Sequence, residues 1–227
     1  MYPQSVIFDF DGVIVDTEPL HYRAFQELLT PLGLGYSWEE YCRTYMGFDD
    51  RDAFREAFAV GGRPLPREEL ERLIERKAEL FQEIVAQGVP PYPGVVALIR
   101  RLRAEEVPLA VCSGALRSDI EPILAGLAIG DCFSCIVTAE DVEHSKPDPA
   151  SYRLAFEKLR TLYPELRDAE HSCAIEDTPA GIASATGAGL RVVAVTNSYS
   201  ADRLAQANLV VTSLEELPAR FGELPTA

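Results

Sequence analysis

Six short apolar runs, separated by sequence of helical pattern, constrain the fold of this chain more than any other feature. They are "SVIFDF" (5–10), "PLAVCSG" (108–114), "FSCIVTAE" (133–140), "SCAIEDT" (172–178), "LRVVAV" (190–195) and "NLVVT" (208–212). Strands that are apolar at nearly every position are typical of a parallel sheet covered by helices on both faces. We therefore predict an α/β fold with a doubly wound parallel sheet, whose ligands bind beyond the carboxyl ends of the strands.

The long interval between the first two runs predicts a second, inserted domain. The first run ends near Asp9 and the second begins near Pro108, whereas a strand–helix–strand crossover takes only about 30 residues. Two stretches inside the interval, 20–33 and 67–88, have the spacing of amphipathic helices. The apolar stripe of the first is Leu20, Ala24, Leu28 and Leu32, and the stripe of the second is interrupted only by Lys77.

The ends of this interval predict how the two parts of the chain are joined. "DTEP" at 16–19 leads out of the first strand, and the proline-rich "GVPPYPG" at 88–94 leads back. Two connections at one edge form a hinge, and proline limits the freedom of the return segment. We predict a small helical domain at 17–87 inserted in a core of 1–16 and 88–227, with Trp38 in the interior of the helical domain.

Composition excludes several classes of partner. The net charge is −15, from 21 basic and 36 acidic residues, and this balance repels nucleic acid and anionic membranes. No run approaches the ~20 apolar residues of a membrane span, and the first residues lack a signal-peptide pattern. We expect a cytoplasmic protein, a monomer or a weak dimer, that binds neither nucleic acid nor membrane.

The cysteines predict no metal site of their own. There are five, an odd count that argues against a disulfide framework. "CFSC" at 132–135 has no second pair to complete the four ligands of a zinc site. We expect Cys132 and Cys135 to be small apolar residues near a buried strand.

Polar residues gather where the predicted strands end. Asp9 and Asp11 follow the first run, and the other members of the set are Ser113, Lys146, Glu176 and Asp177. Crowded carboxylates raise one another's pKa unless a cation joins them, and a site built from oxygen atoms suits Mg²⁺. Ser113 and Lys146 could then hold phosphoryl oxygens.

This order of motifs resembles the haloacid dehalogenase superfamily, and within it the capped phosphatases. The motifs that carry the resemblance are "DFDGVIVDT" (9–17), "VCSG" (111–114), "SKPDP" (145–149) and "EDTPAG" (176–181), and the resemblance covers essentially the whole chain. The family members that it resembles include phosphoglycolate phosphatases and β-phosphoglucomutases. The resemblance implies a Mg²⁺-dependent phosphatase that acts through an aspartyl-phosphate intermediate.

The resemblance also implies a role for each residue of the site. Asp9 would be the nucleophile and Asp11 the general acid and base. The metal ligands would be Asp9, the backbone carbonyl of Asp11 and Asp177, with Glu176 bound directly or through water. Gly12 and Gly114 would face the phosphoryl group in tight turns, and Thr17 would support the hinge and the substrate through hydrogen bonds.

Several alternatives remain open for these motifs. Asp9 and Asp11 could simply form a turn, and Asp177 could cap the next helix. A dehalogenase is disfavoured because such enzymes lack the second aspartate, which is present here as Asp11. A non-catalytic phosphate-binding protein is disfavoured because the nucleophile and Lys146 are both retained.

A sugar phosphomutase is the principal alternative function. "EPLHYRAF" (18–25) looks like the matching segment of β-phosphoglucomutases, with His21 at the position of their histidine. Those mutases carry an arginine three residues after a glycine, whereas Asp50 stands three residues after Gly47 and Arg51 comes one later. An acidic side chain disfavours a second phosphate, so a phosphatase is preferred, and a one-residue shift would restore Arg51 to the arginine's position. The predicted substrate is a small phosphomonoester such as phosphoglycolate or a sugar phosphate, contacted by His21, Asp50 and Arg51.

Overall fold

The computed structural model describes residues 2–46, 48 and 50–224. The chain forms two compact units, one made of Met1–Asp16 with Pro90–Ala227 and the other of Thr17–Val89. We call the first the α/β unit and the second the helical unit. The helices of the described residues include none with the length and apolar character needed to cross a membrane.

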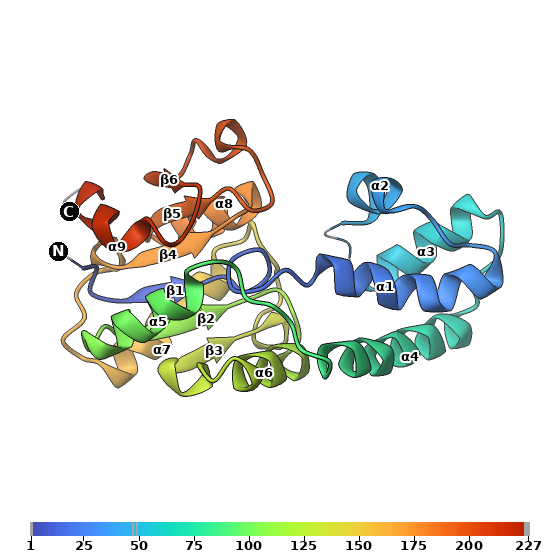
Figure 1. Ribbon diagram of the computed structural model, residues 1–227, viewed down its shortest axis with the longest axis horizontal. Coiled ribbons are helices and arrows are strands. Elements are labelled where there is room, and N and C mark those ends of the chain that lie inside the picture. Colours follow the sequence, from blue (N-terminus) through green and yellow to red (C-terminus); the bar gives the residue numbers. More distant parts are fainter. Residues whose placement is uncertain (1, 47, 49, 225–227) are drawn as a thin grey trace. The chain divides into compact units, whose positions relative to one another are not determined.

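The α/β unit is built on a parallel sheet of six strands, in the order β3-β2-β1-β4-β5-β6 (Figure 1). The strands are β1 (Val6–Phe8), β2 (Leu109–Cys112), β3 (Cys135–Val137), β4 (Cys173–Glu176), β5 (Arg191–Val195) and β6 (Leu209–Val211). Each strand falls inside one of the six predicted runs, and the predicted fold class is confirmed. The core strands β1, β2 and β4 are buried along their whole length.

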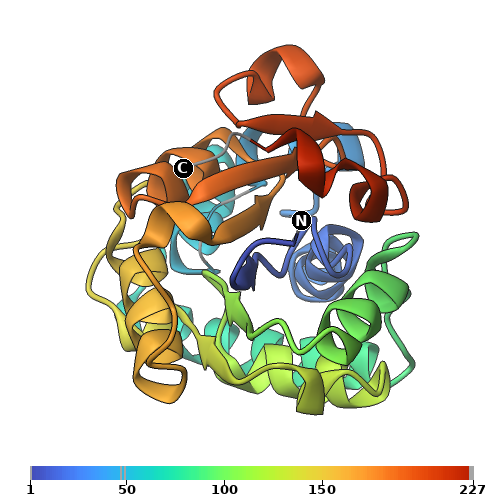
Figure 2. The ribbon, with the colours of Figure 1, turned by 90° about the vertical axis from the view of Figure 1, so that its left-hand side faces the viewer.

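Helices cover both faces of this sheet. The longer ones are α5 (Val95–Ala104), α6 (Arg117–Gly126), α7 (Ala150–Leu162) and α8 (Pro179–Gly187), and α9 (Leu217–Arg220) is short. The α7 and α8 side chains pack with one face of the strands in a single apolar cluster that includes Ile7, Tyr152 and Ile182. Figure 2 shows α7 and α8 on one side of the sheet and α5 on the other.

The strand register brings the ends of three strands together. Phe8 lies opposite Val111 of β2 and Ile175 of β4, and the Asp9 amide continues the ladder by donating to the Ile175 carbonyl at 2.9 Å. The chain passes from β1 to β2 and β3 on one side, whereas β4, β5 and β6 lie on the other. The edge beyond β1 is therefore the switch point at which such sheets bind ligands.

The helical unit contains α1 (Glu18–Leu29), α2 (Trp38–Glu40), the π-helix η2 (Tyr41–Tyr45), α3 (Asp50–Val60) and α4 (Arg67–Val85). Both predicted amphipathic helices are present, but the stripe of α1 differs from the prediction. Its buried residues are Ala24, Phe25 and Leu29, because Phe25 and Leu29 pack in the aromatic core of this unit while Leu28 and Leu32 lie at its margin.

Trp38 was expected in the interior of the helical unit, and this prediction is wrong. Its side chain is 41% exposed. The interior is filled instead by Tyr36, Tyr41 and Tyr45, which are all buried. Trp38 begins the short helix α2 and stacks its ring on Tyr41, at 5.3 Å between the ring centroids.

Candidate active site

Lys146 joins two carboxylates at the carboxyl edge of the sheet. Its Nζ donates to Asp9 Oδ1 and to Glu176 Oε1, both at 2.6 Å. A third bond of 3.1 Å reaches the carbonyl oxygen of Cys112, the last residue of β2. One lysine from the segment between β3 and α7 therefore ties together the ends of β1, β2 and β4 through charge-assisted hydrogen bonds.

Glu176 is fully buried and is held by several further donors. Tyr152 of α7 donates its hydroxyl to Oε1 at 2.7 Å. The second oxygen, Oε2, accepts from the Asp177 amide and from the Thr178 hydroxyl, each at 3.2 Å. Because both oxygens are bound, Glu176 is fixed in place as a rigid part of the site.

Asp177 and Gly12 lie in direct contact at the centre of the edge. Asp177 is 1% exposed, and its Oδ2 accepts a hydrogen bond from the Ser198 hydroxyl. A Cβ atom added at Gly12 would stand 1.9 Å from this oxygen, and Gly12 has a φ of +79°. Only glycine fits both the conformation and the space, so the close approach of β1's loop to Asp177 explains the glycine of the "DFDG" motif.

The charges of the cluster shift the pKa of its members. Burial raises the pKa of Asp9 well above its usual range, and Glu176 and Asp177 add to the rise while Lys146 opposes it. Burial also raises the pKa of Asp177 to about 7. Burial on its own would lower the pKa of Lys146, but Asp9 and Glu176 outweigh it and raise that pKa well above the usual value. The lysine stays charged, and the raised pKa values of Asp9 and Asp177 show that their ionised forms are disfavoured without a further positive charge.

The acidic residues fit a magnesium ion. Asp9, Glu176 and Asp177 each offer an oxygen, and these three atoms lie within 4.8 Å of one another. Asp177 Oδ1 is buried and has no hydrogen-bond partner among the described residues, although a buried carboxylate oxygen is costly to leave unpaired. Hard oxygen donors in a negative environment are what Mg²⁺ prefers.

The remaining predicted residues of the α/β unit lie at the same edge. Asp11 forms an isolated bridge with Val15, and its charge contributes to the raised pKa of Asp177. Ser113 is 3% exposed and directly follows Cys112, whose carbonyl binds Lys146. The Ala115 amide donates to Ser113 Oγ at 3.0 Å. Gly114 lies between them, with open space where a side chain would project.

The structure corrects one alternative reading of Asp177. The side chain that caps α8 belongs to Thr178, whose Oγ1 accepts from the Gly181 amide at 3.0 Å. Asp177 is therefore not the capping residue of this helix, and its carboxylate points into the acidic cluster. Pro179 at the first position of α8 needs no hydrogen-bond partner for its nitrogen.

In the helical unit, two predicted substrate contacts converge on a lysine. Lys77 of α4 is 3% exposed, and its Nζ lies 2.7 Å from Asp50 Oδ1 and 2.9 Å from His21 Nδ1. Lysine only donates, so His21 accepts at Nδ1 and carries its proton at Nε2. Burial, followed by the charge of Lys77, lowers the pKa of His21 well below its usual value. The His21 ring stacks on Phe81 at 4.2 Å.

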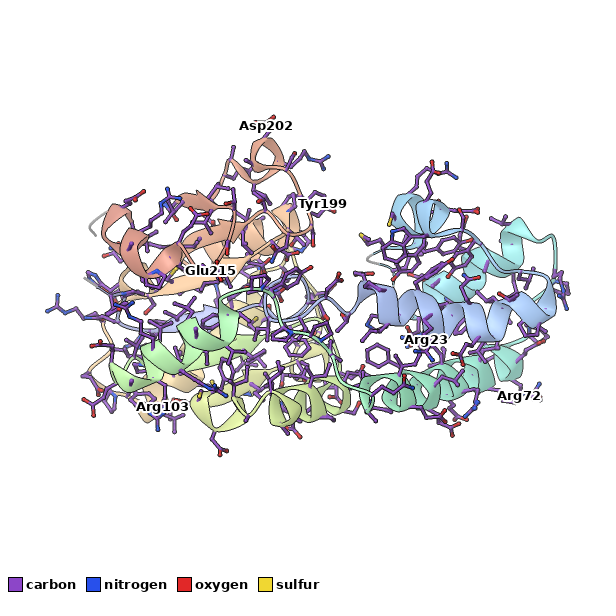
Figure 3. The ribbon with its side chains drawn as sticks, viewed as in Figure 1. Arg23, Arg72, Arg103, Tyr199, Asp202 and Glu215 are labelled. Carbon is purple, nitrogen blue, oxygen red and sulfur yellow. The ribbon has the colours of Figure 1, made fainter. Side chains whose placement is uncertain are left out.

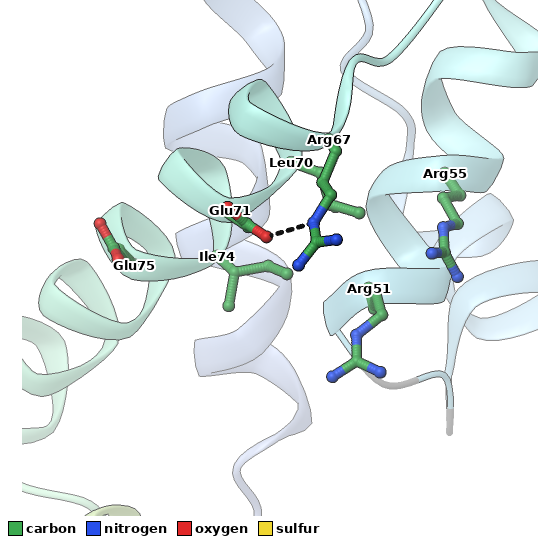
Figure 4. Close-up of a pocket in the computed structure, with 7 residues that line it drawn as sticks. All are labelled: Arg51, Arg55, Arg67, Leu70, Glu71, Ile74 and Glu75. Carbon is green, nitrogen blue, oxygen red and sulfur yellow. Dashed lines mark hydrogen bonds and ion pairs between the residues drawn. The ribbon is translucent and has the colours of Figure 1, made fainter.

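Arg51 lies in different surroundings from its neighbour Asp50. It lines a groove of about 570 Å³ between α3 and α4, together with Arg55, Arg67, Leu70, Glu71, Ile74 and Glu75 (Figure 4). Arg67 forms an ion pair with Glu71, at 2.8 Å between Nε and Oε1.

Among the other predicted substrate contacts, Thr17 directly precedes α1 and is 2% exposed. Gly47, the reference position for the predicted contacts Asp50 and Arg51, lies outside the described residues.

Four residues with a place in these clusters were not predicted as site residues. Lys77 had a signal in the sequence, because it interrupts an apolar helical stripe. Tyr152 is part of none of the motifs that marked the site. Asn197 and Ser198 follow β5, and no motif marks them; their contacts with Gly12 and Asp177 become visible only once the order of the strands is known.

Known proteins resemble this chain over most of its length. Residues 6–195 match the family described as haloacid dehalogenase-like hydrolase. Protein CbbY of Rhodobacter capsulatus is 33% identical over 207 residues, 87% of each chain. A phosphorylated carbohydrates phosphatase of Thermotoga maritima is 28% identical over 208 residues, again 87% of each.

A solved structure agrees with these relatives. The crystal structure of a CbbY mutant from Rhodobacter sphaeroides, in complex with xylulose-(1,5)bisphosphate, matches with a TM-score of 0.82 and 25% identity. The match covers 95% of this chain and 96% of that one. The parallel sheet, the order of the motifs and the matched family lead to one assignment. The chain belongs to the haloacid dehalogenase-like hydrolases.

Proposed function

We propose that the chain is a Mg²⁺-dependent phosphatase that hydrolyses small sugar phosphates through an aspartyl-phosphate at Asp9. The observation that carries the proposal is the Lys146 bridge between Asp9 and Glu176, with bonds of 2.6 Å to each. This bridge holds the Asp9 carboxylate, at the end of β1, beside the positive charge of Lys146 and close to Glu176. Two relatives support the substrate class, namely a protein named for its action on phosphorylated carbohydrates and one crystallised with a sugar bisphosphate.

In the first step, a carboxylate oxygen of Asp9 forms a bond to phosphorus, and the bond between phosphorus and the sugar oxygen breaks. Asp11 donates its proton to the departing sugar oxygen. Lys146 and Ser113 hold phosphoryl oxygens, together with backbone amides beside Gly12 and Gly114. Lys146 thereby offsets the negative charge that collects on the phosphoryl group.

In the second step, Asp11 takes a proton from water while the water oxygen attacks phosphorus. The bond between phosphorus and Asp9 breaks, which releases phosphate and restores the carboxylate. Asp9, Asp177 and the Asp11 carbonyl would hold Mg²⁺, with Glu176 as a direct or water-mediated partner. The bound ion would screen the negative charges that otherwise keep Asp9 and the phosphate apart.

We assign the helical unit the role of a cap that selects the leaving group. His21 supports this role, since the Lys77 bond at Nδ1 leaves its Nε2–H as a donor for a sugar hydroxyl. Thr17, Asp50 and Arg51 remain predicted substrate contacts. A closing cap would also exclude water from the chemistry.

A sugar phosphomutase is the second candidate, and one contact favours it. The sequence argument against it was the acidic charge of Asp50. That carboxylate is paired with Lys77 at 2.7 Å, so its charge is offset and would repel a second phosphate less. The experiment on function must therefore separate hydrolysis from isomerisation.

Phosphate release across a panel of sugar phosphates and phosphoglycolate tests the function. The panel includes β-glucose 1-phosphate, with glucose 6-phosphate formation as a parallel readout that identifies a mutase. Asp9→Asn should lower the rate by about 10³-fold or more, the scale of losing a catalytic nucleophile. Asp131→Asn is the matched control, because Asp131 is exposed on η3 (Gly130–Cys132), before β3 rather than after it. A rate retained by Asp9→Asn would contradict the assignment of the nucleophile.

A further inference from the structure

The loop after β5 reaches two separate parts of the acidic site. β5 pairs with β4 so that Ala194 lies opposite Glu176, and the end of β5 is therefore next to Asp177. Ser198 donates its hydroxyl to Asp177 Oδ2, and Asn197 Nδ2 donates to the Gly12 carbonyl at 2.7 Å. The next residue, Tyr199, is labelled in Figure 3 and carries the Arg203 guanidinium over its ring.

The Ser198 hydrogen bond makes the two oxygens of Asp177 different, because Oδ2 has a partner and Oδ1 has none among the described residues. With Oδ2 bound to a hydroxyl, the carboxylate cannot rotate freely about its last torsion. The other oxygen, Oδ1, is buried and has no hydrogen-bond partner among the residues described. Ser198 therefore leaves Oδ1 unshared, on a carboxylate that has an oxygen within 4.8 Å of carboxylate oxygens of Asp9 and Glu176.

The Asn197 bond fixes the backbone of the first motif. Gly12 is held at both ends, because its amide donates to the Val15 carbonyl at 2.8 Å while its carbonyl accepts from Asn197. The peptide between Asp11 and Gly12 is planar and trans, so the Val15 bond at the Gly12 amide fixes the direction of the Asp11 carbonyl, while Asn197 holds the next peptide, between Gly12 and Val13. Asn197 and Ser198 thus hold Gly12 and Asp177, which already touch each other.

We propose that Asn197 and Ser198 are positioning residues that set the affinity of the site for Mg²⁺. The inference rests on the proposed function, because it assumes that the acidic site binds this ion. Neither residue touches the ion or the substrate in this role. They act through Asp177 and Gly12, in the way that outer hydrogen-bond partners orient metal ligands.

Calorimetric titration with Mg²⁺ tests the inference without any measurement of activity. Ser198→Ala should raise the dissociation constant by about 10–100-fold, and Asn197→Ala should raise it by a smaller factor, because Asn197 holds the peptide next to the one that carries the Asp11 carbonyl. Ser198→Thr should restore binding to near the original value, because it keeps the hydroxyl and Ser198 is exposed enough to accept a methyl group. Ser200→Ala is the control, since Ser200 is exposed in the same loop and its side chain makes no capping bond.

The outcomes separate this inference from the function on which it rests. If the unchanged protein binds no Mg²⁺, the magnesium proposal fails, and this inference fails with it. If it binds Mg²⁺ and Ser198→Ala binds equally well, only the positioning role is overturned. Equal weakening in Ser198→Ala and Ser198→Thr would also overturn it, because the hydroxyl would not be the cause. Thermal unfolding of each metal-free variant shows whether the fold is intact.

Discussion

Lys146 cannot balance the charge of the residues around it. Its Nζ meets Asp9 and Glu176, while Asp177 is bonded to Ser198 instead. One positive and three negative groups leave a buried surplus, which is costly in a protein interior. The raised pKa values of Asp9 and Asp177 express that cost. A divalent cation would neutralise this surplus of negative charge. The charge of the cluster therefore supports the same metal site as the placement of its three carboxylates does.

Gly12→Ala should destabilise the α/β unit by more than a backbone effect alone. Gly12 has a φ of +79°, and a Cβ atom there would lie 1.9 Å from Asp177 Oδ2. The left-handed conformation costs an L-residue about 1–2 kcal/mol, and the clash adds to this. We expect a loss of unfolding free energy above that range, measured by urea denaturation followed by circular dichroism.

Gly189→Ala provides the matched control for this prediction. Gly189 has a φ of +83°, and its added Cβ would make only an ordinary 3.5 Å contact with Ala169. Gly189 lies in the same unit, so the unfolding free energy lost in Gly189→Ala measures the conformational cost without a clash. Equal losses in the two variants would show that the Asp177 contact does not matter for stability.

At this scale, the sequence predicted the residues that directly follow apolar runs. Asp9 and Asp177 could be placed because hydrophobicity marks where a strand ends, and parallel strands end at one edge. Ser198 lies three residues beyond its strand, and its importance depends on β5 lying beside β4. The order of the strands in the sheet cannot be derived from the hydrophobic pattern of a single segment, so the sequence alone did not identify Ser198.

Helix α4 buries a lysine on its apolar face, and side chains of the neighbouring helices make this possible. Its buried face includes Leu70, Phe81 and Ile84, and Lys77 lies on the same face. The lysine is accommodated because Asp50 of α3 and His21 of α1 both meet it, and two aromatic rings lie 5.1 Å from its Nζ. From α4 alone, Lys77 was only an interruption in a stripe.

Lys77→Met should raise the pKa of His21, because it removes a positive charge while methionine fills similar space. Burial, the larger cause of the lowered pKa, would remain, so the rise is partial. NMR titration of the histidine ring protons measures it, and His21→Gln identifies the signal among the three histidines. Arg76→Met is the control, since Arg76 is the preceding residue of α4 but its side chain is 50% exposed.

The same shift has a consequence for stability. The folded pKa of His21 lies below its unfolded value of about 6.5. The unfolded chain therefore takes up this proton first, and the stability that neutral His21 contributes is present above about pH 6.5 and is lost as the pH falls toward the folded pKa. This loss should be smaller in Lys77→Met. An unchanged His21 pKa in that variant would contradict the electrostatic role of Lys77.

The lengths of the strands were predicted less well than their existence. The run 133–140 gives only the three residues of β3, Cys135–Val137. β3 is an edge strand with β2 as its one neighbour, and pairing stops where β2 ends at Cys112. The end of a strand is thus decided by its partner, which hydrophobicity along one run does not report.

For the whole molecule, the alternation of apolar and helical segments was sufficient to predict the α/β class. The match to the haloacid dehalogenase-like hydrolases over residues 6–195 agrees with it. The net charge of −15 also bears on the whole molecule, because acidic proteins repel themselves and attract cations. A ligand that binds the folded state stabilises it, so binding of Mg²⁺ at the proposed site should show in thermal unfolding.

Mg²⁺ should stabilise the protein more as the pH rises through about 7. The folded pKa of Asp177 is raised to about 7, from a usual value of 3.8. In the metal-free protein, the folded state holds this proton where the unfolded state does not, so its contribution to stability falls as the pH rises between these values. The ion competes with the proton, and a ligand at 100 times its dissociation constant stabilises by about 2.7 kcal/mol.

Thermal unfolding with Mg²⁺ or with a chelator, at about pH 5.5 and about pH 8, measures this effect, because each 1 kcal/mol moves the melting temperature of a chain of this size by about 2–4 °C. The shift produced by Mg²⁺ should be small at the lower pH and several degrees at the higher. Asp177→Asn keeps the shape of the side chain, but the asparagine has no carboxyl proton to exchange and binds Mg²⁺ more weakly than a carboxylate does. It should lose most of the Mg²⁺ shift, and its metal-free form should lose less stability than the unchanged protein over the same rise in pH. A shift of equal size at both pH values would mean that Asp177 does not exchange its proton for the ion.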